Sequence, residues 1–424
     1  MSKIIDLDYV TKIEGHARLF IKIDKGKIKK CNLQLFEGSR FFEGILKGKL
    51  YNDISHISSR ICGICSVVHT ITALKAIENA FKVGVSEQTK LLRELLLIGG
   101  LIQSHSLHLY FLALPDYRGF SSALEMASKH REDVVRGLEL KKIGNQIVRV
   151  IGGRDIHPIA AVVGGFSRLP KQKELDELLD SLKKIRKNTE ETVNLFCSLK
   201  YPDHKKYTEY FALQGNSYFN SDKIISCVGQ KCVPTTDYEK HFREYFKEGS
   251  TAEFATKDGK SYMVGALARI VNNQSMLSAK SRKYAQKILD KKFSPYMNNA
   301  AQAIEIFEGV ERCIDILEKL KLKKEELTKI IPKAGSGIGT SEAPRGILFH
   351  HYMFDENGVC TMANITTPTT QNLENIGDNI RLFLPKILDK SKEEIQLKVE
   401  ELIRAYDPCI SCSTHFLEIN WEQS

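Results

Sequence analysis

The stretch RICGICSVVH occupies residues 60–69, and DPCISCSTH occupies residues 407–415. Each stretch contains a CxxC pair, formed by Cys62 and Cys65 in the first and by Cys409 and Cys412 in the second. A two-residue spacer lets both sulfurs of a pair converge on one metal ion, so the two pairs supply four thiolates. Four-sulfur sites are typical of zinc and iron–sulfur centres, and soft thiolates also suit other late transition metals.

The two pairs lie near opposite ends of a chain of 424 residues. Zinc ribbons and fingers instead close short local loops. A site that joins both ends of a large chain is expected in its middle, which suits catalysis better than local folding support. On spacing alone, three interpretations stay open: a structural zinc or iron–sulfur site, a redox dithiol or unrelated pairs, and a catalytic metal.

The composition is that of a globular protein with a large core. Hydrophobic residues make up 42% of the chain and charged residues 27%, which excludes wholesale disorder. The formal charge of +10 is spread along the chain, so no nucleic-acid partner is expected. Ten cysteines are too few for a disulfide scaffold. The six outside the pairs are predicted to be buried small residues, although Cys227 and Cys232 leave a minor second site open.

Neither a membrane span nor a secretory signal is predicted. The most apolar stretch, residues 91–114, contains Arg93 and Glu94, which favours a buried helix over a direct membrane span. The N-terminus carries Asp6 and Asp8 and lacks a long apolar run. Export of this chain together with a partner subunit that carries the targeting signal stays open.

Periodicity predicts a mainly α fold of the α+β type, with a large helical body and small β-hairpin elements. A hairpin is predicted over residues 17–36 with its turn at 24–27, and two strands over 346–354 and 359–366. Residues 335–339 are glycine-rich and predict a loop. Helices are predicted over residues 66–83, 86–114, 120–150, 172–199, 276–291, 296–320, 370–383 and 391–405.

We expect residues 1–424 to form a single large catalytic domain. Within it, residues 1–40 form the N-terminal β-hairpin element and residues 200–270 form an irregular α+β insertion. Residues 416–424 are a possible removable C-terminal extension.

Six separate segments resemble the large subunit of nickel–iron hydrogenases, in the order of that family and across nearly the whole chain. The two cysteine stretches resemble its N- and C-terminal signatures. The other four are KIEGH at 12–16, RFFEGILKG at 40–48, EAPRG at 342–346 and PTTQN at 368–372. The resemblance implies the hydrogenase large-subunit fold and reversible, heterolytic cleavage of dihydrogen into protons and electrons. Lys12 stands where the family usually has arginine. Lysine keeps the positive charge but cannot form the two parallel hydrogen bonds of a guanidinium.

By this resemblance, all four cysteines bind nickel. Cys62 and Cys409 are implied as terminal ligands, whereas Cys65 and Cys412 bridge nickel to an iron that carries cyanide and carbon monoxide. Thiolates are soft, electron-rich donors, which suits changes in the oxidation state of nickel.

The resemblance also implies a magnesium site. Its side-chain ligands are Glu43 and His415, and a backbone carbonyl near Ile365 is the third. A carboxylate suits magnesium, whereas a histidine is a less typical ligand, and both residues have solvated polar surface positions as the alternative.

Proton transfer is assigned by the same resemblance. Cys409 is the expected first proton acceptor, and Glu14 is the carboxylate that passes the proton on. A carboxyl group in a dry pocket has a raised pKa, which suits a relay. A surface carboxylate at a strand end is the alternative for Glu14.

Arg345 is expected over the open metal position, where its cation hydrogen-bonds cyanide and polarises the substrate. Pro344 precedes it, and the fixed φ of proline helps to aim the chain. Asp116 and Asp407 are expected to pair with the guanidinium, although either aspartate also suits a turn beside its proline.

Two further residues are implied near the centre. Thr369 is expected to donate its hydroxyl to a second cyanide, with helix capping as the alternative. His69 lies four residues after Cys65, on the same face of a helix. A hydrogen bond to a bridging sulfur or to an iron ligand is therefore expected, with simple packing as the alternative.

The chain has no further cysteine array, and the glycine run 335–339 lacks the GxGxxG spacing of a dinucleotide site. Electrons are therefore expected to leave through an iron–sulfur small subunit that carries Fe–S clusters, and then through further electron-transfer subunits. Maturation proteins and a C-terminal processing peptidase are implied partners, and the terminal motif indicates the cytoplasmic, cofactor-linked group.

Two other functions stay open. One is a non-catalytic relative such as the quinone-site subunit of complex I, although those subunits lack the paired cysteines. The other is a zinc-stabilised scaffold, which metal analysis separates from a hydrogenase.

Overall fold

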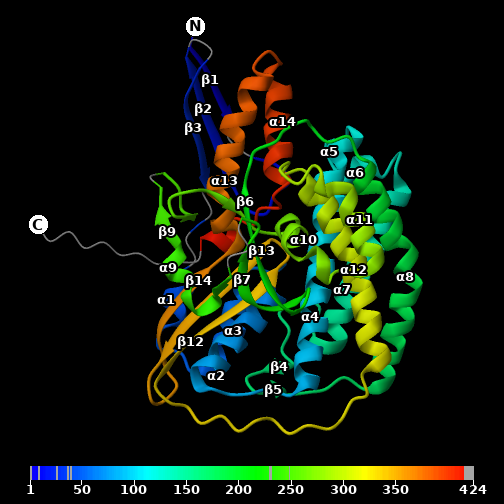
Figure 1. The fold of residues 1–424 in the computed structure, drawn as a ribbon, viewed down its shortest axis with the longest axis vertical. Helices are drawn as coiled ribbons and strands as arrows, with labels where there is room; N and C mark the ends of the chain where they lie inside the picture. The colour runs from blue at the N-terminus through cyan, green and yellow to red at the C-terminus, as the bar shows by residue number, and fades with distance from the viewer. Residues whose placement is uncertain are drawn as a thin grey trace, which may run out of the picture.

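A computed structural model describes residues 2–7, 10–24, 27–35, 38, 41–228, 232–247 and 249–414. Long helices form one side of the molecule, and small sheets with the remaining helices form the other (Figure 1). This arrangement is the mainly α fold that the sequence predicts. Lys25 and Gly26 of the predicted turn, His415, and the predicted extension 416–424 lie outside the described residues.

The helical body packs tightly because glycines let its helices approach closely. An added Cβ at Gly99 would lie 2.8 Å from Ile147 Cγ2, and one at Gly144 would lie 2.8 Å from the Gln103 backbone nitrogen. The helices of this body are α4 (Glu87–Leu107), α5 (Leu114–Arg118), α7 (Arg131–Gly152), α8 (Gln172–Ser198), α11 (Ala279–Leu289) and α12 (Met297–Lys319).

A π-helical segment, His108–Ala113, joins α4 to α5, so the helix runs from Glu87 to Arg118. By length and composition this helix is able to cross a membrane, but 83% of its most apolar window is buried inside the fold. It therefore occupies the position of a core helix, as its polar residues predict.

The predicted helix over 120–150 is wrong at its start. Residues 123–126 form a separate short helix, α6 (Ala123–Met126), and α7 begins only at Arg131. The Ser122 side chain caps α6, and acidic residues in the first turn of α7 favour a second helix start.

The predicted glycine loop at 335–339 is also wrong, because these residues begin strand β12 (Gly335–Ala343). An added Cβ at Gly337 would lie 2.2 Å from the Ala76 carbonyl oxygen, and one at Gly339 would lie 2.2 Å from the Thr72 carbonyl oxygen. Both carbonyls belong to α3 (Ser66–Phe81). The glycines are there because the strand lies directly on the helix backbone.

β12 continues through a tight turn into β13 (Gly346–Phe354), which pairs with β14 (Cys360–Thr366). The last two strands confirm the predicted hairpin. Ala343 pairs with Gly346, so Pro344 and Arg345 form the turn. The sheet thus carries Arg345 at one end, while α3 begins immediately after Cys65.

The N-terminal hairpin is confirmed as β2 (Ala17–Asp24) and β3 (Lys27–Leu35), and β1 (Ser2–Leu7) adds a strand that the sequence did not predict. Between residues 200 and 270 the described chain is rich in strands. They are β6 (Glu209–Ser217), β7 (Asn220–Ser226), β8 (Cys232–Pro234), β9 (Phe242–Phe246), β10 (Glu253–Lys257) and β11 (Tyr262–Met263), with the short helix α9 (Tyr238–His241).

The C-terminal helices α13 (Pro368–Phe383) and α14 (Lys392–Arg404) are confirmed, and a capping box at Ser391 starts α14. After α14 the chain turns back into the core, and its last described residues are buried. The remaining elements are α1 (Phe42–Leu46), α2 (Tyr51–Ser58), α10 (Ala266–Asn273), β4 (Ala161–Val162) and β5 (Gly165–Phe166).

Candidate metal centre

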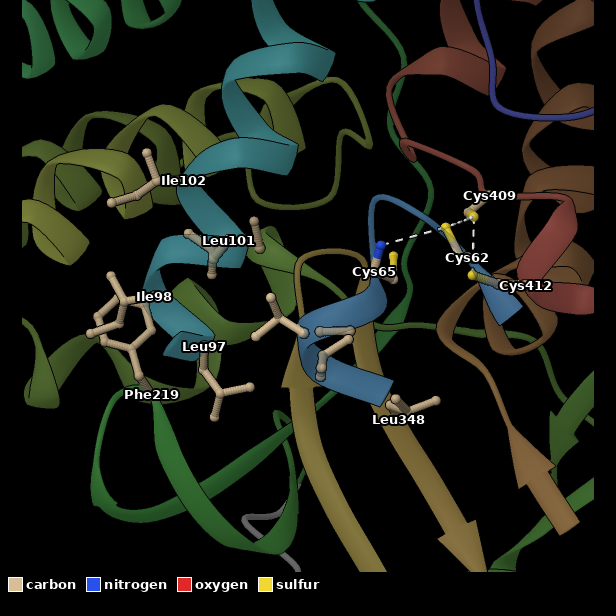
Figure 2. Close-up of a cluster of buried hydrophobic side chains, with 14 of the residues drawn as sticks. Cys62, Cys65, Leu97, Ile98, Leu101, Ile102, Phe219, Leu348, Cys409 and Cys412 are labelled. Atoms are coloured by element: carbon tan, nitrogen blue, oxygen red, sulfur yellow. Dashed lines mark hydrogen bonds between the residues drawn. The ribbon is translucent and has the colours of Figure 1, made fainter. Parts of the chain in front are cut away.

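The four motif cysteines meet in the core. Their sulfurs all lie within 4.8 Å of one another, and all four residues are buried. Figure 2 shows the first pair on the segment that leads into α3 and the second pair facing it on the C-terminal segment. The Sγ atoms of Cys62 and Cys409 are 3.4 Å apart, and those of Cys409 and Cys412 are 3.0 Å apart. The two ends of the chain therefore form one site.

Such a site favours bound cations. Hydrogen bonding from Cys409 lowers the pKa of Cys62, whereas burial raises the pKa of Cys409. The apolar core thus disfavours ionising all four thiols unless positive charge is nearby. An all-sulfur donor set in a dry pocket suits a soft late transition metal, so these residues fit nickel and a second metal beside it.

Arg345 supplies one permanent cation. Its Nη1 donates to Cys65 Sγ at 3.1 Å, and its Nε donates to the Asp407 carbonyl oxygen at 2.6 Å. Its Nη2 lies 2.9 Å from Asp407 Oδ1. Burial opposes the charge, but Asp407 and the neighbouring cysteines raise the pKa of Arg345. The structure thus places Arg345 and Asp407 together beside the sulfurs.

Asp407 has a φ of 53°, in the left-handed region that asparagine and aspartate tolerate better than most residues. The left-handed residue lies just past the end of α14 and directs the following segment into the core.

The predicted pairing of Asp116 with Arg345 is wrong. The Asp116 carboxylate forms ion pairs with Lys12 and with Arg404, whose Nε lies 2.6 Å from Asp116 Oδ2. The reason is its position in the first turn of α5, where Asp116 faces the N-terminal segment and the end of α14. The lysine that departs from the family motif therefore has an acidic partner.

Glu14 lies against the second cysteine pair. It forms an isolated parallel bridge with Cys409, and its carbonyl oxygen accepts from the Ile410 backbone nitrogen at 2.9 Å. Its carboxylate Oε2 accepts from the Ser411 backbone nitrogen, also at 2.9 Å. The predicted relay carboxylate is thus bound to the loop that carries two of the four thiols.

Thr369 and His69 also lie at the centre. Thr369 Oγ1 accepts a hydrogen bond from the Cys409 backbone nitrogen at 3.0 Å. His69 Nε2 lies 3.9 Å from Cys412 Sγ, and its Nδ1 lies 3.0 Å from His350 Nε2. His69 therefore lies within reach of one of the two sulfurs that the resemblance implies as bridging ligands.

Two of the three residues predicted to hold magnesium are in contact, through the Ile365 N–H and not through its carbonyl oxygen. Glu43, in the first turn of α1, accepts from the Ile365 backbone nitrogen through Oε1 at 2.7 Å. Ile365 is fully buried in β14. His415 lies outside the described residues.

The other cysteines differ in exposure. Cys313 and Cys360 are buried as predicted, and burial raises the pKa of Cys360 to about 11. Cys197 and Cys227 are only partly buried, and Cys232 is exposed, so the prediction is wrong for these three. Within the described part of the chain, only the four motif cysteines are grouped as a potential metal site.

Sequence reasoning missed several buried polar residues around Arg345 and His69. They are His108, Arg269, Gln302, Glu305, His350 and Tyr352. One signal was available in the predicted helix 296–320, where polar residues recur on the helix face that carries Gln302.

The family model described as nickel-dependent hydrogenase matches residues 40–138 and 254–415. The chain belongs to this family. Sulfhydrogenase 1 subunit alpha of Pyrococcus furiosus is 37% identical over 98% of both chains. Sulfhydrogenase 2 subunit alpha of the same organism is 35% identical, over 98% of this chain and 100% of the relative.

Solved structures agree with this membership. A crystal structure of an NAD+-reducing nickel–iron hydrogenase in the dihydrogen-reduced state matches with a TM-score of 0.89 and 25% identity, covering 97% of this chain and 99% of the other. The nickel–iron–selenium hydrogenase of D. vulgaris Hildenborough shares the fold, with a TM-score of 0.82 and 24% identity, over 98% and 100% of the two chains. The protein is thus the catalytic large subunit of a nickel-dependent hydrogenase, an oxidoreductase.

Proposed function

We propose that Cys62 and Cys409 bind nickel as terminal ligands, and that Cys65 and Cys412 bridge it to an iron carrying cyanide and carbon monoxide. The observation that supports this proposal is the convergence of four buried sulfurs within 4.8 Å from the two ends of the chain. When bound, such a centre supplies the redox-active metal at which dihydrogen is polarised and split.

The chain's own residues prepare this site. Arg345 places a fixed cation in a pocket that excludes water, where electrostatic stabilisation is strongest. Asp407 holds that guanidinium through its carboxylate and its carbonyl oxygen. Pro344 restricts the turn that carries Arg345. Thr369 holds the loop of the second pair by accepting from the Cys409 backbone.

Proton transfer runs along the second cysteine loop. The Cys409 thiolate takes up the first proton, and Glu14 passes it on towards solvent. The support is that Glu14 binds the backbone of the two residues that follow Cys409. His69 Nε2 faces Cys412 Sγ at 3.9 Å, where a hydrogen bond to the thiolate would tune the electron density on that sulfur.

A magnesium ion is held by Glu43, His415 and the Ile365 carbonyl. The contact between the Glu43 carboxylate and the Ile365 backbone supports this part. A hard, oxygen-preferring cation here would tie α1 to β14 close to the C-terminal segment.

The chain of residues 1–424 folds as a single catalytic domain in the cytoplasm, with residues 416–424 as an extension that is not needed for catalysis. It passes electrons to an iron–sulfur small subunit and on to further electron-transfer subunits. Maturation proteins load the centre, and a processing peptidase removes residues 416–424. The relatives that are named as alpha subunits of sulfhydrogenases support an arrangement of several subunits.

The test uses the complete complex, purified without oxygen. We expect about one nickel per chain and infrared bands from metal-bound cyanide and carbon monoxide. Cys412→Ser should lose nickel and activity, because it removes one of the two bridging thiolates. Cys197→Ser is the control, since this half-buried cysteine lies outside the sulfur group and its replacement should change neither quantity.

Two results would contradict the proposal. One is zinc as the only metal in the sulfur site, which would favour the scaffold interpretation. The other is full nickel content and turnover in Cys412→Ser.

A further inference from the structure

One face of α12 carries three buried polar side chains, Asn298, Gln302 and Glu305. Their exposures are 3%, 0% and 0%. Spacings of four and three residues put them on the same side of the helix. Buried polar groups are costly unless they are hydrogen-bonded, so their partners show what this polar face of α12 stabilises.

Gln302 holds Asp407. Its Nε2 donates to Asp407 Oδ2 at 3.0 Å, while the other carboxylate oxygen of Asp407 faces Arg345. Gln302 Oε1 lies 2.6 Å from His108 Nδ1, and the other ring nitrogen of His108 lies 2.7 Å from the Arg404 carbonyl oxygen. Turning the amide over would bring an oxygen to the Asp407 carboxylate, so the orientation of Gln302 is fixed.

Glu305 holds Arg269, which is fully buried. The Arg269 Nε and Nη2 atoms donate to the two Glu305 carboxylate oxygens at 2.6 and 2.7 Å. Burial alone would raise the pKa of Glu305, but Arg269 lowers it to about 2, so the pair is ionic at neutral pH. A bidentate pair of this kind leaves the guanidinium with a single orientation.

Of the remaining donors of Arg269, one binds the Glu342 carboxylate through Nη1 at 2.8 Å, and the others reach the turn that carries Arg345. Nη1 donates to the Ala343 carbonyl oxygen at 2.8 Å, and Nη2 donates to the Pro344 carbonyl oxygen at 3.0 Å. Arg269 therefore binds the two peptide groups directly before Arg345.

Asn298 completes the polar face of α12. Its Oδ1 accepts from the Leu267 backbone nitrogen at 3.0 Å, and its Nδ2 donates to the Ala405 carbonyl oxygen at 2.9 Å. These contacts tie together the start of α10, which carries Arg269, and the end of α14, which leads to Asp407.

We infer that the polar face of α12 positions the Arg345–Asp407 pair beside the cysteine sulfurs, with Gln302 holding Asp407 and Arg269 holding the turn before Arg345. Arg269 and Gln302 are positioning residues for the hydrogenase reaction. The inference rests on the proposed role of Arg345.

The main test is Arg269→Lys in the complete complex. Lysine keeps the charge but has only about three N–H donors, fewer than Arg269 uses to bind Glu305, Glu342 and the two carbonyl oxygens. We expect turnover to fall about tenfold or more, and the cyanide and carbon monoxide bands to shift in the direction seen for Arg345→Lys. In the Arg345→Lys background, the same change should lower turnover by less than about threefold, because both substitutions disturb one interaction.

Arg93→Lys is the matched control. Arg93 is buried, forms a bidentate ion pair with Glu78 and donates to the Val162 carbonyl oxygen. It contacts neither Arg345 nor the cysteine sulfurs. Its replacement should leave turnover and the infrared bands unchanged. An equal loss from Arg269→Lys in both backgrounds, or a loss of turnover without a band shift, would overturn the inference.

A second variant, Gln302→Met, covers the case in which Arg269→Lys fails to bind nickel. Gln302→Met should shift the cyanide and carbon monoxide bands. Its effect on turnover should be smaller in the Asp407→Asn background than in the wild type. If both variants lose nickel while Arg345→Lys keeps it, the polar face of α12 serves only metal insertion, and the inference is overturned. If Arg345→Lys itself changes neither turnover nor bands, the proposed role of Arg345 fails, and that result is distinct from the others.

Discussion

At the scale of single residues, Glu14 is bound in a way that separates its chemistry from its packing. The Ser411 backbone N–H needs only an oxygen acceptor, and Glu14 Oε2 supplies it at 2.9 Å. A glutamine side chain offers the same acceptor through its amide oxygen but cannot take up and release a proton. The two roles of Glu14 are therefore separable by one substitution.

We predict that Glu14→Gln lowers turnover about 100-fold, the range expected when a proton-transferring group is lost. Nickel content should stay at the wild-type level, because the contact with Ser411 is kept. Dye-linked dihydrogen oxidation measures turnover, and isotope exchange between dihydrogen and heavy water reports proton exit. Wild-type exchange and turnover in Glu14→Gln would exclude this carboxylate from the proton path.

At the scale of elements, the contact between α3 and β12 aligns the first cysteine pair with the turn that carries Arg345. The strand lies so close to the helix that Gly337 and Gly339 have no room for a side chain. This contact therefore sets the distance between two parts of the metal centre that come from distant regions of the sequence.

We predict that Gly339→Ala lowers the free energy of unfolding by about 2–3 kcal/mol, because its Cβ would lie 2.2 Å from a backbone oxygen that cannot move alone. The thermal unfolding midpoint of the complex should fall. Gly377→Ala in α13 is the control, since the nearest atom to its Cβ is 3.8 Å away and alanine favours a helix. A midpoint for Gly339→Ala at or above that of the wild type would refute the close-packing explanation.

Most elements were predictable from the sequence because their periodicity is local. α8 and α12 follow their apolar spacing, and the hairpin of β13 and β14 has a turn-forming sequence between its strands. β12 was not predictable, because a glycine run predicts a loop unless the helix beneath it is known. The same applies to the site: motifs predicted the four cysteines and Arg345, whereas the partners of Arg269 and Asp116 exist only in the folded chain.

At the scale of the whole molecule, the metal centre is a cross-link between the two ends of the chain. The sulfurs of Cys62 and Cys409 lie side by side although 347 positions separate them in the sequence. A metal that binds only the folded site stabilises the fold, and it does so most where its ligands would otherwise separate.

We predict that removing the metals lowers the thermal unfolding midpoint and raises amide hydrogen exchange at residues 60–66 and 405–414 together. The long helix α8 should keep its protection, because it contributes no ligand to the centre. Hydrogen-exchange mass spectrometry of loaded and metal-free complex measures both regions in one experiment. Unchanged exchange at the two cysteine segments would show that the protein alone holds the ends together.

The distance between the two cysteine pairs along the chain also sets an order of events during biosynthesis. A ribosome adds about 5–20 residues per second, so the second pair is made roughly 20–70 s after the first. During that interval the nascent chain carries the first two thiols of the site without the second two. Any thiophilic ion in the cell can bind them. The correct metals are therefore best inserted only after translation has almost finished, or by a protein that delivers them.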